Sequence, residues 1–270
     1  MNILSILDAW RYVLLADFLR YTLTAGGAFL VFWVWRPALV RSRRLQEAHP
    51  DWARLRSEIA YSMSTVVVFS GVGLTLLYAA QAGLTRIYTD VQAHGWAYLL
   101  ASVVLMIVLH DAYFYWTHRL LHWRPLYRRV HHVHHRSTSP TPWAAYAFHP
   151  VEAVVQAGVY PLIVFTIPAY PLALELFLLY MIARNVLGHL GFEIFPRGFA
   201  SHPLTWWHTT PTHHDLHHRF GRDNYGLYFA LWDDWLGTTQ PGYREAFEAV
   251  TSRCAMTRPR SRTQPALRNA

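Results

Sequence analysis

The sequence predicts an all-α protein that crosses a membrane several times and carries a histidine-rich cap on one side of it. Of the 270 residues, 53% are hydrophobic and only 15% are charged, a balance unusual for a soluble domain. Residues 59–84 contain no charged side chain, which is enough for a helix to cross a hydrocarbon core of about 30 Å. Most of the 17 histidines lie between residues 110 and 218, in short patterns with helical spacing.

Three further apolar segments are candidate spans. The segment 18–35 precedes the uncharged stretch, and 96–117 follows it. The last segment, 153–183, carries prolines near its middle, so we expect two helices joined by a hinge at 168–171. Buried helices of a soluble protein are the alternative, and the length of the segments disfavours it. Trp and Tyr are abundant, as expected for side chains at a lipid–water boundary.

The chain divides into three regions by composition. Residues 1–95 hold the N-terminal spans, and residues 96–240 hold the histidine patterns and form the expected catalytic domain. Residues 241–270 are polar, and we expect a disordered C-terminal tail there. The first residues lack the charged start and short apolar run of a secretory signal, so none is expected.

The arginines predict an orientation. Segments 36–58 and 119–136 are rich in Arg, whereas 85–95 carries a single one, so the Arg-rich segments are expected to be cytoplasmic. If 153–183 is a hairpin, the histidines beyond residue 188 share that side. The chain has Arg but no Lys, a usage typical of GC-rich bacterial genomes, which suggests a bacterial inner membrane. The charge of +8 fits anionic lipid better than nucleic acid, because no basic stripe with stacking aromatics occurs.

Three histidine patterns have the spacing of helical metal ligands. His118 and His122 are an i,i+4 pair at the end of the third span. A second pattern, H-x-x-H-H, begins at His131, and a third with the same spacing begins at His214. Each H-x-x-H-H segment is expected to place its imidazoles on a common face. Together they exceed the coordination number of one ion, so the patterns predict two metal ions in a shared site.

Other site types have less support. The single Cys254 offers no thiolate site or disulfide framework, and no H-E-x-x-H motif of a zinc protease occurs. A divalent-metal transporter remains an alternative, although its ligands would be expected near the bilayer midplane and not at the ends of the spans. A zinc-dependent membrane hydrolase is another, because imidazole spacing alone does not separate Fe from Zn, Cu or Ni.

The motifs in residues 100–240 strongly resemble those of the fatty acid hydroxylase and sterol desaturase superfamily. They include D-A-Y-F-Y-W-T-H-R-L-L-H from Asp111, H-H-V-H-H from His131, H-P-V-E from His149, H-L-G-F-E from His189 and H-D-L-H-H from His214. They also include N-Y-G at residues 224–226 and W-D-D-W-L-G-T at residues 232–238.

The resemblance implies a membrane oxidoreductase with a di-iron centre, which zinc could occupy in isolated protein. Such an enzyme hydroxylates or desaturates a lipid, which is a sterol, a fatty acyl chain or a related molecule. It uses O2 and electrons from an external donor, either a reductase with ferredoxin or a cytochrome b5-like protein. Carried over position by position, the implied metal ligands are His118, His122, His131, His134, His135, His189, His214, His217 and His218.

Several neighbours of these motifs are candidates for supporting the ligands, because a carboxylate that accepts the free N–H of a ligand imidazole fixes its tautomer. These candidates are Asp111, Glu152, Glu193 and Asp215. Family members place a further histidine where this chain has Asn185. Either Asn185 supports the site through a water molecule, or one of three other histidines replaces the missing ligand: His110, His208 or His213.

Overall fold

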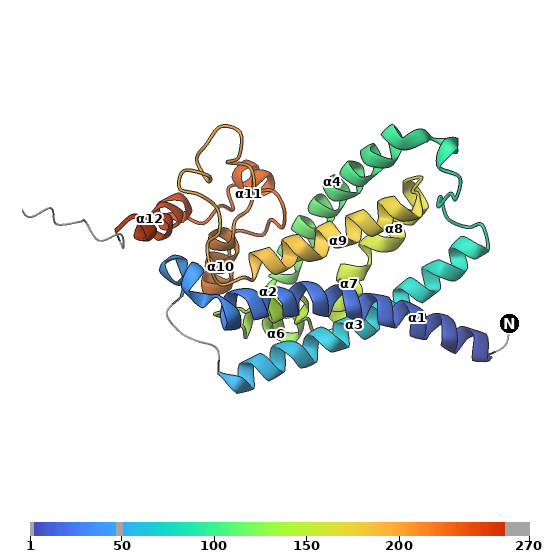
Figure 1. Cartoon of the computed structure of the whole chain (residues 1–270), viewed down its shortest axis with the longest axis horizontal. Coiled ribbons are helices and arrows are strands. Elements are labelled where there is room, and N and C mark those ends of the chain that lie inside the picture. The colour runs from blue at the N-terminus through green and yellow to red at the C-terminus, as the bar shows by residue number, and fades with distance from the viewer. Residues whose placement is uncertain (1–2, 47–50, 257–270) are drawn as a thin grey trace, which may run out of the picture.

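The computed structural model describes residues 3–46 and 51–256, which form helices joined by turns and loops (Figure 1). Within these two ranges no β-strand forms, and the only sheet-like pairings are isolated bridges, such as the one between Arg44 and Phe192. The fold is therefore all-α, as the sequence predicts.

The N-terminal span begins earlier than residue 18, where the sequence predicts its start. It runs from Ser5 to Trp35 as one apolar helical segment. The charges of Asp8 and Arg11 interrupt the apolar pattern, but the two side chains are exposed and pair at 3.3 Å, so the helix continues through them. The segment combines α1 (Ile3–Tyr21), the π-helical η1 (Thr22–Gly26), α2 (Gly27–Phe29) and the π-helical η2 (Leu30–Trp35).

Three more helices are long and apolar enough to cross a membrane: α3 (Trp52–Gln81), α4 (Gly95–Leu121) and α9 (Pro171–Gly188). Two shorter apolar helices, α7 (Pro150–Ala157) and α8 (Val159–Thr166), precede α9. The expected break near Pro168 is confirmed, since α8 ends before it and α9 starts after it. The outward faces of the spans are apolar, which suits contact with lipid: examples are Leu23, Leu100 and Val104, each at least 60% exposed.

The two ends of the bundle are distinguished by backbone hydrogen bonds. At one end, Glu193 N donates to Arg43 O at 2.9 Å, so the connection after the first span touches the histidine-rich region. At the other end, Arg86 N donates to Val164 O at 2.8 Å, so the turn between α3 and α4 meets the end of α8. Segments 36–46 and 189–256 therefore share one end, and the 82–94 connection lies at the opposite end (Figure 1).

Short helices build the cap, by which we mean residues 122–149 and 189–256. Figure 1 shows α10, α11 and α12 gathered at the end of the bundle away from the N-terminus. The elements of the cap are α5 (Arg124–Leu126), η6 (Tyr127–His131), α6 (His132–His135), η7 (Pro142–Tyr146), α10 (Pro211–Phe220), α11 (Leu231–Leu236) and α12 (Tyr243–Met256). Single 3-10 turns at η3 (Pro37–Leu39), η4 (Arg41–Arg43) and η5 (Val91–Ala93) complete the described chain.

The expectation of a disordered tail from residue 241 is wrong for its first half. α12 packs Tyr243, Phe247 and Val250 into the cap, where each is at most 6% exposed. These residues recur every three to four positions, so one helix face is apolar although the overall composition is polar. Residues 257–270, the rest of the expected tail, lie outside the described residues.

Candidate metal centre

Four segments of the chain bring histidines to the cap end of the bundle. His118 lies in the last turn of α4, and His122 is the C-cap of that helix. His189 is the C-cap of α9. α10 begins at Pro211, and the side chain of Thr210 accepts the N–H of residue 213, as expected of an N-cap. η6, α6 and α10 supply the remaining members, His131, His134, His135, His214, His217 and His218.

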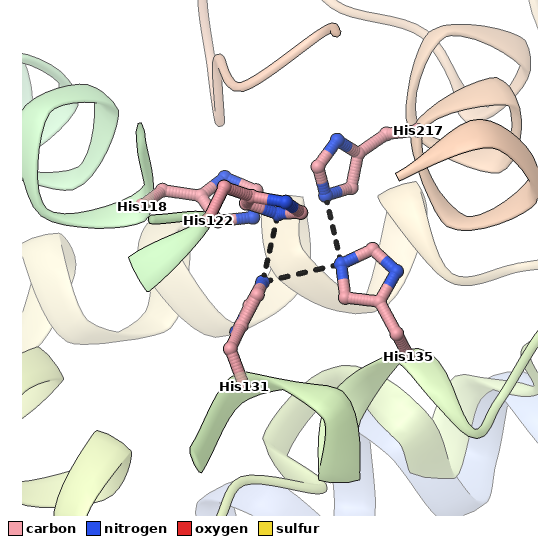
Figure 2. Close-up of side chains that lie close together, drawn as sticks. All are labelled: His118, His122, His131, His135 and His217. Carbon is pink, nitrogen blue, oxygen red and sulfur yellow. Dashed lines mark hydrogen bonds between the residues drawn. The ribbon is translucent and has the colours of Figure 1, made fainter. Parts of the chain in front are cut away.

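One set of five, called here the first histidine group, has ring nitrogens within 4.8 Å of one another. Figure 2 shows the rings of this group drawn together from three segments. Nε2 of His131 is 3.0 Å from Nε2 of His122 and 3.1 Å from Nε2 of His135. Nε2 of His135 is in turn 3.1 Å from Nε2 of His217. The members are His118, His122, His131, His135 and His217.

The second histidine group contains His134, His189, His214 and His218, and all four side chains are buried. Nε2 of His189 is 3.0 Å from Nε2 of His214 and 3.2 Å from Nε2 of His218. The Nε2 atoms of His214 and His218 are 3.1 Å apart, and His134 adds its Nε2 at 3.3 Å from that of His189. Every ligand that the resemblance implies therefore belongs to one of the two groups.

The two H-x-x-H-H segments are shared crosswise between the groups. In the first segment, the outer pair His131 and His135 belongs to the first group and the middle His134 to the second. In the second segment, the outer pair belongs to the second group and the middle His217 to the first. The expectation of one common face per segment is wrong, because successive residues of a helix point about 100° apart and the two groups flank each segment on different sides.

Hydrogen bonding alone does not account for this arrangement. The Nε2 atoms of His189, His214 and His218 form a triangle, and a ring nitrogen carries at most one proton, which can point to one neighbour only. Burial first, and then the charge of neighbouring imidazoles, lower the pKa of His214 and His218 well below the usual value, so these rings are neutral. Neutral imidazoles whose lone pairs converge are what a metal ion requires.

The spacing of the nitrogens also fits a metal ion. Two ligands about 2.1 Å from an ion, at octahedral or tetrahedral angles, are roughly 3.0–3.4 Å apart. The shortest Nε2 separations in both groups, from 3.0 to 3.3 Å, lie in that range, and one ring nitrogen from each member of a group lies within 4.8 Å of all the others. The residues present therefore fit one ion in each group.

The outer nitrogens, Nδ1, of several ligands are held by acceptors that fix the ring orientation. Of the carboxylates expected in this role, Glu152 takes it: its Oε1 accepts from Nδ1 of His131 at 2.7 Å, with both side chains buried. The other acceptors are backbone carbonyl oxygens, which bind His118 (Tyr225 O, 2.9 Å), His189 (Asn185 O, 2.8 Å) and His217 (Asp223 O, 2.6 Å).

The other expected carboxylates contact backbone or side-chain donors that belong to no ligand imidazole. Asp111 accepts the N–H groups of residues 228 and 229, at 2.9 and 3.1 Å. Glu193 accepts the N–H and the hydroxyl of Thr212, and Asp215 accepts a side-chain amide at 2.7 Å. Proximity in sequence did not place these carboxylates beside a ring: Asp111 on α4, Asp215 on α10 and Glu193 in the loop after α9 all contact other donors. They anchor the segments that carry the ligands.

Asn185, which stands where family members have a further histidine, does not enter either group. The side-chain amide of Asn185 donates to a backbone carbonyl at 2.9 Å, and its contact with the site is the carbonyl that accepts from His189. The three substitute histidines lie outside the groups as well. His110 is 2.9 Å from a tyrosine hydroxyl, His213 is 3.4 Å from a buried carboxylate, and His208 stacks on a tryptophan.

Asp233 is a supporting residue that the sequence analysis missed. Its carboxylate accepts the N–H groups of Tyr225 and Gly226, both at 2.8 Å, and the hydroxyl of Thr238 at 2.7 Å. It thereby fixes the carbonyl of Tyr225, which holds His118. Asp233 and its partners Tyr225, Gly226 and Thr238 all belong to the N-Y-G and W-D-D-W-L-G-T motifs. These motifs carry the family resemblance, but the sequence alone does not indicate that they hold each other.

Two cavities with mostly apolar walls lie between the membrane-spanning helices and the histidines. The larger cavity, of about 410 Å³, lies between α1, α3, α8 and α9. The inner cavity, of about 20 Å³, shares Phe69 and Tyr160 with the larger one as walls. It is also lined by Phe148, whose ring centroid is 5.2 Å from that of His134. The second histidine group therefore lies just beyond the inner cavity.

Comparisons with known proteins place this arrangement in a family. The family model described as fatty acid hydroxylase matches residues 103–238, half of the chain. A Delta(7)-sterol 5(6)-desaturase of Gibberella zeae is 35% identical over 202 residues, which are 74% of this chain and 60% of that protein. A Delta(7)-sterol 5(6)-desaturase of Aspergillus fumigatus is 31% identical over 238 residues, 80% of this chain and 72% of that protein.

The lathosterol oxidase of Mus musculus is 31% identical over 196 residues, which are 68% of this chain and 62% of that enzyme. The chain thus spans about 60% of the length of several curated relatives that it matches. No solved structure matches it. With its four apolar helices and its histidine patterns, the chain is a membrane protein of the fatty acid hydroxylase and sterol desaturase superfamily.

Proposed function

We propose that this protein is an O2-dependent oxidoreductase that hydroxylates or desaturates a lipid. The observation that carries the proposal is the juxtaposition of two convergent imidazole groups with an apolar cavity that opens among membrane-spanning helices. The names of the relatives support it, because they describe sterol desaturases and a sterol oxidase. A sterol, a fatty acyl chain or a related lipid is the proposed substrate class.

The proposed cofactor is a pair of iron ions, one in each histidine group. Bound iron would supply O2 binding and the oxidising power for an unactivated C–H bond. Imidazole ligands also suit zinc, so iron is proposed from the family and not from the ligand set.

The residues of the chain have four tasks in this proposal. The Nε2 atoms would hold the ions. Glu152 and the three carbonyl oxygens accept hydrogen bonds from the Nδ1 atoms and thereby fix the orientation of the rings. The walls of the two cavities orient the lipid. Phe148, packed beside His134, places an apolar ring in the wall of the inner cavity next to the second histidine group.

Two electrons and two protons are needed beyond those that the lipid gives up, because desaturation reduces O2 to two water molecules and hydroxylation places one oxygen atom in the lipid and reduces the other to water. We propose that they come from an external one-electron donor, either a ferredoxin with its reductase or a cytochrome b5-like protein. The cap is the part of the molecule that such a donor would reach.

We also propose that the cap faces the cytoplasm of a bacterial cell. The Arg-rich connection after the first span lies at the same end as the histidines, whereas the 82–94 connection at the opposite end has one Arg. The absence of Lys from an Arg-rich chain supports a bacterial source.

The proposed activity is tested by comparing lipid extracts of cells that produce the wild type or His217→Ala, with and without O2, by mass spectrometry. An oxidised lipid should form with the wild type and disappear with the variant, which should still insert in the membrane because the spans are unchanged. His94→Ala is the control, since that ring packs on Tyr88 far from both groups. Oxidation of the lipid by His217→Ala at the wild-type rate would contradict the proposal. Uptake of metal into cells without any lipid oxidation would favour a transporter.

A further inference from the structure

Three charged side chains meet within the membrane-spanning helices. Arg20 of α1 binds Glu175 of α9 through Nε at 2.7 Å and binds Asp17 of α1 through Nη1. Asp17 and Arg20 are at most 23% exposed at the side chain. Charged groups inside a bilayer are costly, and where they occur they commonly mark a ligand path or a functional site. We call these three residues the polar cluster.

Two residues of the polar cluster line the larger cavity. Asp17 and Arg20 are the charged side chains among its described lining residues, and Glu175, which does not line it, is joined to the cavity wall through its bond to Arg20. Most other lining residues are aliphatic or aromatic, such as Leu76, Ile163 and Phe177. A molecule in the cavity would therefore bury an apolar body and meet polar atoms at one place, which is the usual design of a lipid site.

The charges of the cluster are unbalanced. Two carboxylates face one guanidinium, so the cluster has one negative charge in excess when all three groups are ionised. In a surrounding of low dielectric constant this excess repels an anionic head group and favours a hydrogen-bond donor. A hydroxyl group can donate to a carboxylate oxygen, whereas a fatty acid carboxylate would add a further negative charge.

We propose that the polar cluster anchors the hydroxyl end of a neutral long-chain lipid, and that the enzyme selects such lipids over free fatty acids. The proposal rests on the proposed function, because the anchored lipid is its substrate. The carboxylate of Asp17 accepts a hydrogen bond from the hydroxyl group, and Arg20 holds the carboxylates of Asp17 and Glu175 in place.

The position of the anchor also predicts which part of the lipid is oxidised. Glu175 and His189 lie at the two ends of the same stretch of α9, fourteen residues apart, which is about 21 Å at 1.5 Å per residue. Between them lies the inner cavity, which shares Phe69 and Tyr160 with the larger cavity as walls. The reacting carbon is therefore about 20 Å from the anchored hydroxyl, far along the chain of the lipid.

The test measures binding and needs no turnover. Purified protein in lipid nanodiscs would be titrated with a fluorescent long-chain alcohol, which is then displaced by an unlabelled alcohol or by the fatty acid of equal length. Measurements at pH 8 keep the acid ionised. The wild type should prefer the alcohol by roughly tenfold or more. Asp17→Asn/Glu175→Gln reverses the charge of the cluster to positive, so it should prefer the fatty acid.

Two further variants keep the test decisive. Glu175→Gln, at the more exposed carboxylate, neutralises the cluster and should give an intermediate preference if the double variant does not fold. Asp8→Asn removes a carboxylate from an exposed pair on the same helix and should leave the preference unchanged. Equal binding of both lipids by the wild type, or an unaltered preference after charge reversal, would overturn the anchor. Neither result touches the proposed oxidation, which the His217→Ala comparison tests separately.

Discussion

His134 and His135 are neighbours in the sequence, yet their side chains enter different histidine groups. Each H-x-x-H-H segment thus lies between the two proposed ions and serves both of them. The arrangement couples the sites, because any movement of α6 or α10 shifts ligands in both groups.

The crosswise sharing predicts the metal content of a double variant. His134→Ala/His214→Ala removes ligands from two segments but from one group only, leaving the second group with two imidazoles and the first with all five. The ratio of metal to protein, measured by elemental analysis, should fall from two to about one, since two ligands rarely hold an ion against solvent. If each segment served its own ion, both sites would be weakened and both metals lost.

Acid should destabilise the metal-free protein. Burial, and then neighbouring imidazoles, lower the pKa of His135 from the usual 6.5 to about 3 in the fold. Between these values the unfolded chain binds more protons than the folded one, so stability is complete above pH 6.5 and falls as the pH drops below it. Thermal unfolding of apoprotein in detergent at pH 7.5, 6 and 5 should show a falling midpoint. A midpoint that rises toward pH 5 would contradict the neutral, buried imidazoles.

The histidines could be predicted from the sequence because their spacing is local and the family motifs are dense. The acceptors behind them could not, apart from Glu152. Carbonyl oxygens such as those of Tyr225 and Asp223 carry no signature in the side-chain sequence, and they reach the rings only after the loop 221–230 folds over α4. The division of each segment between two groups likewise depends on where the other helices lie.

At the scale of elements, α10 and α12 form a small packing unit that supports the second histidine group. Phe247 of α12 is fully buried and packs in a cluster with Ala200, Leu216 and Tyr243. Leu216 stands between ligands of both groups on α10. Packing of α12 therefore fixes the rotation of the helix that supplies three members of the histidine groups.

Phe247→Ala should weaken the cap without removing a ligand. Replacing a fully buried Phe costs roughly 3–5 kcal/mol, and here the loss falls on the contact between α10 and α12. Metal affinity measured by competition with a chelator should drop, while insertion of the spans persists. Phe220→Ala, at an α10 residue that is 47% exposed, is the matched control and should change little. Equal metal affinity in wild type and Phe247→Ala would show that α12 is dispensable.

The lengths of the elements show what composition can and cannot predict. The spans could be predicted because long uncharged stretches seldom occur outside membrane helices, and the break before α9 followed from its prolines. α12 could not be predicted from composition, because its apolar face consists of a few residues in an otherwise polar segment. The burial of that face becomes evident only in the structure, where α10 covers it.

For the whole molecule, the structure requires the first connection and the cap to share one membrane face, with the 82–94 connection on the other. Reporter fusions at Ser42 and Thr251 should therefore report one compartment, and a fusion at Arg86 the opposite one. The Arg distribution further predicts that Ser42 is cytoplasmic. Placement of Ser42 and Thr251 on opposite sides would be incompatible with the hydrogen bond between Glu193 and Arg43.

The arrangement of the whole molecule brings the larger cavity among the spans, the proposed lipid site, together with the two histidine groups of the cap. The larger cavity, the inner cavity and the second histidine group follow one another along α9, which carries Glu175 near its start and ends at His189. In the proposed function, a lipid would therefore remain among apolar helices while one of its carbons approaches the histidines. This geometry explains why the ligands lie at the ends of the spans and not in the middle of the bilayer.

The central claim is that one chain holds two metal ions in two histidine groups. Its most direct measurement is the ratio of iron to protein after anaerobic loading of the purified protein with Fe(II) and removal of loosely bound ions. The two groups predict two tightly bound ions per chain. A ratio of one, or of none, in folded protein would contradict the account.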